Sequence, residues 1–273
     1  MKHKTITLRE NFPEATLTIF ACESKATSPR PAVIVCPGGA YCDLSPREAE
    51  SIARAYTEAG CNTYILRYSV GENAANCNPL IEAALSIQYV REHASEHNTD
   101  PKRIFICGFS AGGHLAASAG ILWNDPVVRE ALGINQGKSP EGINRPDGMI
   151  LCYPVITAGQ GMHRLSFCRL SGTDEPSAEQ FERFSLERHV DDTTPPAFLW
   201  HTFADKGVSM RNSLCLMDAM LEHGIPCESH IFPTGVHGLS LGTEETAANN
   251  PQYIEPHVTP WMDLSIRWIK DMF

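Results

Sequence analysis

Short runs of apolar residues recur along the chain and alternate with segments whose apolar residues follow a helical period. Four runs, AVIVC, IFIC, MILCY and AFLW, are almost wholly apolar, which is typical of strands buried on both faces of a parallel sheet. The first two strand candidates instead alternate apolar and polar positions, as antiparallel strands near a sheet edge do. The expected strands are Thr5–Arg9, Ala15–Cys22, Ala32–Cys36, Thr63–Tyr68, Ile104–Cys107, Met149–Tyr153, Ala197–His201 and Ser229–Phe232.

Helices are predicted between these strands, where apolar residues recur every three or four positions. The repeated order of strand, helix and strand implies right-handed crossovers. We therefore expect an α/β fold with a mostly parallel, doubly wound sheet of about eight strands, antiparallel strands at its N-terminal edge and helices on both faces. The three apolar stripes are Leu80, Ala83, Ala84, Ile87, Val90 and Ala94; Met210, Leu214, Met217 and Leu221, ended by Gly224; and Trp261, Leu264, Trp268 and Met272.

Residues 156–196 interrupt this alternation with a polar, irregular excursion between two strands, in which we expect one helix near Ser177–Phe184. Excursions at the carboxyl end of a strand often shape the ligand pocket of α/β enzymes. The sequence contains no internal repeat and no interdomain linker. We therefore expect a single domain over residues 1–273, with a small cap-like excursion at about 156–196.

Composition and charge narrow the function classes. With 273 residues, of which 42% are hydrophobic and 20% charged, the chain is typical of a globular protein. Its net charge of −10 argues against binding to nucleic acid or to an anionic membrane surface, because both attract basic proteins. The ten cysteines include no CxxC pair, no apolar run reaches the ~20 residues of a membrane span, and no signal peptide is recognisable. We expect a cytoplasmic protein, and its oligomeric state stays open.

The clearest chemical motif is Gly108-x-Ser110-x-Gly112, which follows a buried strand and opens a helix of small residues. A sharp turn from strand to helix leaves no room for Cβ atoms at the flanking positions, which explains the glycines. The turn places the serine at a helix N-terminus, where the dipole favours a developing negative charge. In this context the motif predicts a nucleophilic serine, although the bare pattern would also fit a tight turn.

A nucleophilic serine needs a base and a carboxylate, which follow it in the order acid, then histidine, in enzymes with this turn. Asp205 follows an apolar strand, and His237 lies in a loop between two glycines after the last strand. Both are expected at the carboxyl edge of the sheet, beside Ser110. The rivals are less well placed: Asp191 and Asp192 lie in a polar turn, His114 and His201 are predicted to be packed, and His163, His189, His230 and His257 lack such a strand-end position.

A glycine-rich loop, Pro37-Gly38-Gly39-Ala40-Tyr41, directly follows the strand Ala32–Cys36. Backbone N–H groups in such a loop can converge on one point, and together with the N–H of Ala111 they would form an oxyanion hole. Taken alone, the same residues would fit a β-turn. The motif downstream favours the oxyanion hole.

Other motifs do not support metal or nucleotide chemistry. The run from His93 to His97 matches the HxxEH zinc pattern, but it flanks an apolar helix stripe and lies at the opposite edge of the sheet from Ser110. Gly137-Lys-Ser139 lacks the first glycine of a P-loop, because residue 132 is leucine, and no GxGxxG is present. We therefore expect no metal and no cofactor.

Together these segments resemble the α/β-hydrolase superfamily, and most closely the small esterases of the lipase/acetylxylan-esterase-like group, which is related to the hormone-sensitive-lipase branch. The stretches that carry the resemblance are CPGGAY (36–41), ICGFSAGGHLAA (106–117), TPPAFLWHTFAD (194–205), NSL (212–214) and HIFPTGVHGLSLG (230–242). The resemblance implies Ser110 as nucleophile, Asp205 as acid and His237 as base, with Gly39, Ala40 and Ala111 as oxyanion donors. The chain departs from the His-Gly-Gly-Gly of the lipase branch at Pro37, which leaves the donor amide in the loop open.

The resemblance also implies a function. We expect a serine carboxylic-ester hydrolase that works through an acyl-serine intermediate, on small-molecule substrates with short acyl groups such as acetyl, including esters of sugars. Tyr41 and the excursion are expected to form a partly polar entrance that binds the substrate. Two alternatives stay open: a serine peptidase or acyltransferase on the same scaffold, and a catalytically silent binding protein.

Overall fold

Eight strands form one sheet in the computed structural model, which describes residues 4–20 and 28–271. Their order is β1-β2-β4-β3-β5-β6-β7-β8; β2 pairs antiparallel with β1 and β4, and the other pairs are parallel. The predicted sheet is therefore confirmed, although the expected end of the second strand at Cys22 lies outside the described residues. The strands are β1 (Lys4–Arg9), β2 (Phe12–Phe20), β3 (Arg30–Cys36), β4 (Asn62–Arg67), β5 (Thr99–Phe109), β6 (Gly148–Cys152), β7 (Ala197–Thr202) and β8 (Cys227–Phe232).

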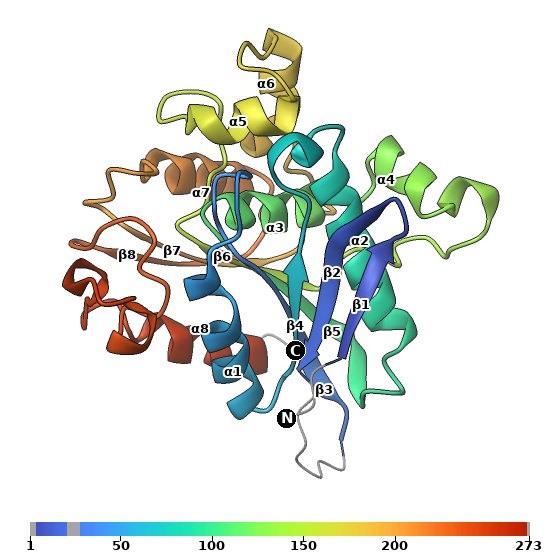
Figure 1. Cartoon of the computed structure of the whole chain (residues 1–273), viewed down its shortest axis with the longest axis horizontal. Coiled ribbons are helices and arrows are strands. Elements are labelled where there is room, and N and C mark those ends of the chain that lie inside the picture. The colour runs from blue at the N-terminus through green and yellow to red at the C-terminus, as the bar shows by residue number, and fades with distance from the viewer. Residues whose placement is uncertain (1–3, 21–27, 272–273) are drawn as a thin grey trace.

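Helices cover both faces of the sheet, as expected (Figure 1). On one face lie α2 (Asn78–Glu92), α3 (Ala111–Ile121) and α7 (Arg211–Glu222), and on the other α1 (Glu50–Glu58) and α8 (Trp261–Asp271). Strand β3 shows how the two cores arise. Its side chains alternate, so that Ile34 packs toward the first group of helices and Val35 toward the second, and neither is exposed to solvent.

The three predicted apolar stripes agree with the structure to different extents. The stripe of α2 is buried as expected, and the helix at Trp261 exists, with Met272 outside the described residues. The stripe assigned to α7 is wrong, because Leu214 is 44% exposed and Leu221 is 76% exposed. Helix α7 instead buries its Leu216 face, and with it two polar residues near its first turn, Asn212 and Ser213.

The excursion at 156–196 contains two helices, α5 (Arg164–Ser171) and α6 (Ala178–Phe184). Helix α6 is the one predicted, and its N-cap Ser177 forms a capping box with Gln180, whereas α5 was not predicted. Both helices project from the end of the molecule toward which the β4 arrow points (Figure 1). Asn212 anchors the start of the excursion, since its Oδ1 accepts from the N–H of Ile156 over 2.8 Å.

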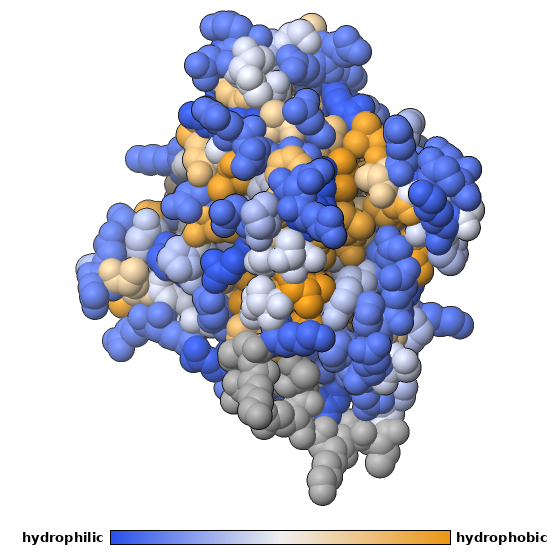
Figure 2. All heavy atoms as spheres, turned by 45° about the vertical axis from the view of Figure 1, so that its right-hand side comes forward, coloured by the Kyte–Doolittle hydropathy of each residue, from blue (hydrophilic) through white to orange (hydrophobic). Residues whose placement is uncertain are grey.

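The surface is mostly hydrophilic on the face shown in Figure 2, where apolar residues gather below the projecting tip. None of the helices in the described residues is both long enough and apolar enough to span a membrane. The nine cysteines of the described ranges are free thiols. Helix α4 (Pro126–Ala131) lies at the periphery of the fold in Figure 1.

Candidate active site

Ser110 lies on the sharp turn between β5 and α3. Its backbone has φ 55° and ψ −117°, a strained conformation for a residue with a side chain. A Cβ at Gly108 would lie 2.0 Å from the carbonyl oxygen of Gly112, and a Cβ at Gly112 would lie 2.2 Å from the carbonyl oxygen of Cys36. Glycine is therefore required at both positions, because α3 approaches β5 and the end of β3 so closely that only bare backbone fits.

His237 and Asp205 approach Ser110 from the ends of two neighbouring strands, β8 and β7. The Ser110 hydroxyl donates to Nε2 of His237 over 2.7 Å, and Nδ1 of His237 donates to Oδ2 of Asp205 over 2.7 Å. Because an ionised carboxylate can only accept, the proton of the neutral imidazole lies on Nδ1 and Nε2 is left to accept. The structure thus brings the three residues selected from the sequence into one hydrogen-bonded chain.

The carboxylate of Asp205 is buried and its oxygens are fully engaged. Oδ1 accepts from the N–H groups of Gly207 and Val208 over 2.8 and 2.9 Å, and Nε2 of His201 lies 3.3 Å from Oδ2. Burial acts to raise the pKa of Asp205, but hydrogen bonds from His201 and His237 outweigh it and hold the pKa well below its usual range. Asp205 is therefore ionised beside His237, whose side chain is 25% exposed.

The loop after β3 lies against the serine turn and holds unpaired backbone N–H groups. The N–H of Gly38 donates to Glu48 over 2.8 Å and is therefore occupied. Within residues 4–20 and 28–271, no acceptor is found for the N–H groups of Gly39, Ala40 and Ala111, the last of which starts a helix. These three amides, chosen from the sequence, are free to bind a negatively charged oxygen.

The prediction for Tyr41 needs a correction. Its side chain is only 1% exposed, so it does not line an open entrance. Burial raises the pKa of the Tyr41 hydroxyl well above its usual value, and the protonated hydroxyl donates to Nδ1 of His114 over 2.9 Å. His114 in turn donates from Nε2 to the carbonyl oxygen of Phe184 over 3.0 Å. Through these two hydrogen bonds His114 connects the loop of Tyr41 to the excursion, and Tyr41 is buried between them.

The rival acids and the zinc pattern lie in other surroundings. Asp191 accepts from the N–H and hydroxyl of Thr193, and Asp192 lies 3.2 Å from His223. His93 stacks on Tyr89. In the ranges that the structure describes, no three side chains of histidine, cysteine, aspartate or glutamate are arranged to hold a metal ion.

Three further residues near the triad were not predicted from the sequence to be part of the site. His201, interpreted from the sequence as packed, is fully buried and accepts from the Ser213 hydroxyl over 2.7 Å while it faces Asp205. His163 belongs to the excursion, and its pKa is lowered chiefly by burial. Glu48 binds the loop after β3. His163 was weighed only as a rival of His237, and a lone glutamate carries no pattern, so nothing in the sequence could have marked Glu48.

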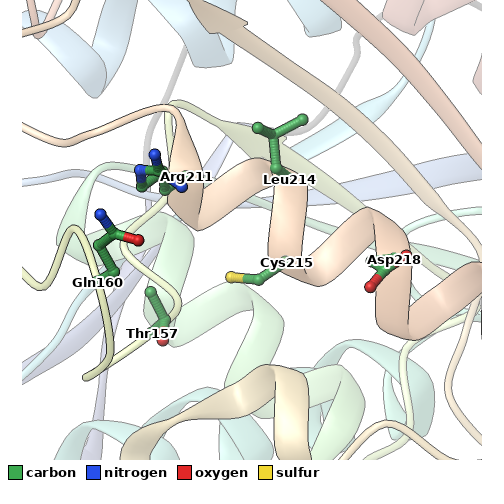
Figure 3. Close-up of a pocket in the computed structure, with 6 residues that line it drawn as sticks. All are labelled: Thr157, Gln160, Arg211, Leu214, Cys215 and Asp218. Atoms are coloured by element: carbon green, nitrogen blue, oxygen red, sulfur yellow. The ribbon is translucent and has the colours of Figure 1, made fainter.

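Two surface hollows lie around α7 and the ends of β7 and β8. One, of about 570 Å³, borders His237 and is lined with polar and aromatic side chains: Lys206, Gln252, Tyr253 and Glu255. The other, of about 460 Å³, lies between α7 and the start of the excursion, and Figure 3 shows Thr157 and Gln160 across from Cys215. No triad residue lines the second hollow. The first hollow therefore lies beside His237, and Ser110 is not among the residues that line it.

Proteins that carry a serine on such a turn, at the carboxyl edge of a sheet with this order, are α/β-hydrolases, and this chain is one of them. The BD-FAE family model matches residues 17–220. The chain belongs to the BD-FAE family.

Comparison with individual proteins confirms the resemblance to acetylxylan-esterase-like hydrolases. The chain is 36% identical over 219 residues to endo-1,4-beta-xylanase B of Butyrivibrio fibrisolvens, covering 79% of this chain and 33% of that protein. It is 27% identical over 220 residues to an acetylxylan esterase of Xylanibacter ruminicola, covering 78% and 42%. An acetyl ester-xyloside bifunctional hydrolase from Caldicellulosiruptor lactoaceticus has a TM-score of 0.81 at 30% identity, covering 98% of this chain and 96% of that one. The chain thus spans less than half the length of the xylanase and of the acetylxylan esterase.

Proposed function

We propose that the protein hydrolyses carboxylic esters, with Ser110 as the nucleophile, His237 as the general base and Asp205 as the carboxylate that orients His237. The observation that carries the proposal is the continuous hydrogen-bonded chain from Ser110 to Asp205, with 2.7 Å at each step, beside three free amides. The names of the similar proteins, an acetylxylan esterase and an acetyl ester-xyloside bifunctional hydrolase, favour an ester over a peptide bond.

The reaction follows from this geometry in two halves. Oγ of Ser110 attacks the carbonyl carbon of the ester while its proton moves to Nε2 of His237. The carbonyl oxygen becomes an oxyanion, which accepts from the N–H groups of Gly39, Ala40 and Ala111. The bond to the alcohol then breaks, and His237 returns its proton to the departing alcohol oxygen. A water molecule, deprotonated by His237, attacks the acyl-serine, and Ser110 leaves with the proton.

We infer that the substrates are short acyl esters, acetyl esters of sugars among them. The departing alcohol must lie next to His237, because this residue supplies its proton, and the hollow of about 570 Å³ borders the same residue. Lys206, Gln252 and Glu255 offer hydrogen-bond donors and acceptors there, and Tyr253 adds an aromatic ring, a combination that suits a polyhydroxylated alcohol.

We also infer that the excursion at 156–196 acts as a cap on a single hydrolase domain. Two contacts support this role. The side chain of Asn212 fixes the start of the excursion to α7, and His114 in α3 donates to the carbonyl oxygen of Phe184 in α6. The excursion is thus held against α3, the helix that begins directly after Ser110.

A chain-length series of p-nitrophenyl esters, run beside acetylated xylo-oligosaccharides, tests the substrate class. We expect release of p-nitrophenol from acetate and butyrate to be at least about tenfold faster than from octanoate, and release of acetate from the oligosaccharide. Ser110→Ala serves as the blank. A rate that peaks at decanoate would rule out the sugar-ester assignment, and absence of turnover on every ester would contradict ester hydrolysis and leave the two alternatives.

The alcohol side is tested separately with two exposed side chains of the hollow. Lys206→Ala and Gln252→Ala should each raise KM for the acetylated oligosaccharide by about three- to tenfold and leave p-nitrophenyl acetate hydrolysis unchanged, since each removes about one hydrogen bond. Gln160→Ala, in the hollow of Figure 3, is the matched control and should change neither substrate. Equal KM values for all three variants would place the alcohol elsewhere.

A further inference from the structure

The carboxylate of Glu48 is buried among the loops around Ser110. Glu48 ends the short 3-10 helix Pro46–Glu48 and is 3% exposed. Its Oε2 accepts from the N–H of Gly38 over 2.8 Å, and its Oε1 accepts from the hydroxyl of Tyr153 over 2.6 Å. Both donors are neutral. Burying a carboxylate is costly unless it is hydrogen-bonded, so the bonds that keep Glu48 in place also fix the positions of its two donors.

Tyr153 extends this contact to the loop that carries His237. It directly follows β6 with φ 38°, its hydroxyl accepts from the N–H of Ser240 over 3.0 Å, and its ring lies edge-on to His237 at 5.1 Å. Burial, and next the charge of Glu48, raise the pKa of Tyr153 well above its usual value. Because the hydroxyl keeps its proton, it donates to Glu48. One buried carboxylate is thereby coupled to the His237 loop through a single side chain.

Gly38 couples the same carboxylate to the oxyanion-binding loop. A Cβ on Gly38 would lie 2.8 Å from Oε2 of Glu48 and 3.1 Å from Cβ of Ser110, so Gly38 lies directly between the carboxylate and the nucleophile. The next residues need support from outside the loop, since Gly39, Ala40 and Tyr41 all have positive φ, at 135°, 58° and 59°. Because Gly38 gives its N–H to Glu48, only the following amides are left for the reacting oxygen.

We propose that Glu48 is a positioning residue for ester hydrolysis, which holds the oxyanion-binding amides and the His237 loop in register with Ser110. The inference rests on the proposed function, in which those amides bind the oxyanion. Glu48 does not touch the reacting atoms and acts only through Gly38 and Tyr153. A displacement of about 1 Å in such groups is enough to cost about 100-fold in rate.

Glu48→Gln tests this role, because an amide offers one acceptor oxygen where the carboxylate offers two. We expect kcat for p-nitrophenyl acetate to fall about 10- to 100-fold with KM within about threefold of wild type. The inhibition constant of a trifluoromethyl ketone, which forms a tetrahedral adduct with the serine, should rise by the factor by which kcat/KM falls. Glu82→Gln is the matched control, since Glu82 is a buried carboxylate of α2 bonded to the N–H and hydroxyl of Ser69.

Three results would overturn the inference: a folded Glu48→Gln with kcat within about threefold of wild type, an unchanged inhibition constant, or an equal loss of kcat in Glu82→Gln. If Glu48→Gln does not fold, Tyr153→Phe decides. It keeps the bond to Gly38 but breaks the link to Ser240, so kcat should fall about three- to tenfold, and full activity contradicts the link.

A failure of the proposed function gives a different result. If the wild-type protein hydrolyses none of the esters, the proposed function fails, and the role of Glu48 is then measured by the rate at which a fluorophosphonate labels Ser110. That rate should be about tenfold lower in Glu48→Gln than in wild type and in Glu82→Gln, because the phosphonyl oxygen needs the same amides. Equal labelling rates for Glu48→Gln and wild type overturn the positioning role.

Discussion

The two sides of Ser110 are built in different ways. On the proton-transfer side, defined by His237 and Asp205, side chains from two strand ends meet through hydrogen bonds of 2.7 Å, and the imidazole is a quarter exposed. On the oxyanion side, defined by residues 36–45 with Glu48, the groups that we propose to bind the oxyanion are backbone amides in a loop with three consecutive residues at positive φ. The proton-transfer side thus depends on the identity of its side chains, whereas the oxyanion side depends on the backbone conformation of its loop.

Ser110→Ala should have the largest effect, because it removes the group that both sides serve. We expect kcat for p-nitrophenyl acetate to fall about 10⁴-fold or more. The fold should survive, since alanine fits where serine does, and the thermal denaturation midpoint is the control. A folded variant that keeps a tenth of the wild-type rate would show that another residue is the nucleophile.

Asp205→Asn breaks the proton-transfer side alone. Asparagine can donate to Nδ1 of His237 and so favours the tautomer in which Nε2 can no longer accept, which should lower kcat about 10³- to 10⁴-fold. Asp191→Asn and Asp192→Asn should stay near wild type, because both carboxylates have partners outside the triad. Steady-state kinetics gives kcat for the three variants. A larger loss of kcat in Asp191→Asn or Asp192→Asn than in Asp205→Asn would show that the acid lies at one of those positions.

Gly39→Ala breaks the oxyanion side alone. A Cβ at this position would lie 2.0 Å from the carbonyl oxygen of Asp43, and φ is 135°, so the loop must shift. We expect kcat to fall about 10²- to 10³-fold, the loss typical of a missing oxyanion donor, with a smaller change in KM. Gly60→Ala is the control: its φ is 98° with open space around it, so it should cost stability and leave kcat unchanged.

The same difference explains what the sequence could and could not predict. Buried strands and the helix of α2 were predictable because apolar residues repeat at the period of each element. Helix α7 was predicted with the wrong face, because Asn212 and Ser213 are turned inward to bond the excursion and His201, which outweighs the exposure of Leu221. Hydropathy patterns do not register buried polar residues of this kind.

For the site, the hydrogen-bonded grouping of Ser110, His237 and Asp205 was predictable because these residue types carry chemistry and lie after strands. Tyr41 looked like an entrance residue, because its bond to His114 spans 73 positions of sequence and is invisible in either segment. Glu48 is likewise an ordinary glutamate until Gly38 and Tyr153 are brought to it. Residues that hold backbone through distant hydrogen bonds therefore escape a sequence-based prediction more readily than residues in a recognised motif.

His114 gives the smallest effect and a way to separate the two sides by pH. Burial lowers the pKa of His114 to about 4, below the ~6.5 of an unfolded histidine. Between these two values the unfolded state binds more protons, so the free energy of unfolding falls as the pH drops from about 6.5 to about 4, by at most about 1.4 kcal/mol per pH unit. The stabilisation from Asp205, whose pKa is lowered, is lost only at still lower pH, below about 4.

Urea denaturation at pH values from 4 to 7 measures this slope. His114→Gln should flatten it, because the side chain no longer takes up a proton on unfolding, whereas His257→Gln, at an exposed position, should leave it unchanged. His114→Gln should also lower kcat by less than about tenfold at pH 7, since Tyr41 loses the Nδ1 acceptor of His114 while the hydrogen bonds of His237 stay intact. If the free energy of unfolding of His114→Gln changes with pH as steeply as that of wild type, His114 does not take up a proton on unfolding. Its burial beside Tyr41 would then contribute nothing to the pH dependence of stability.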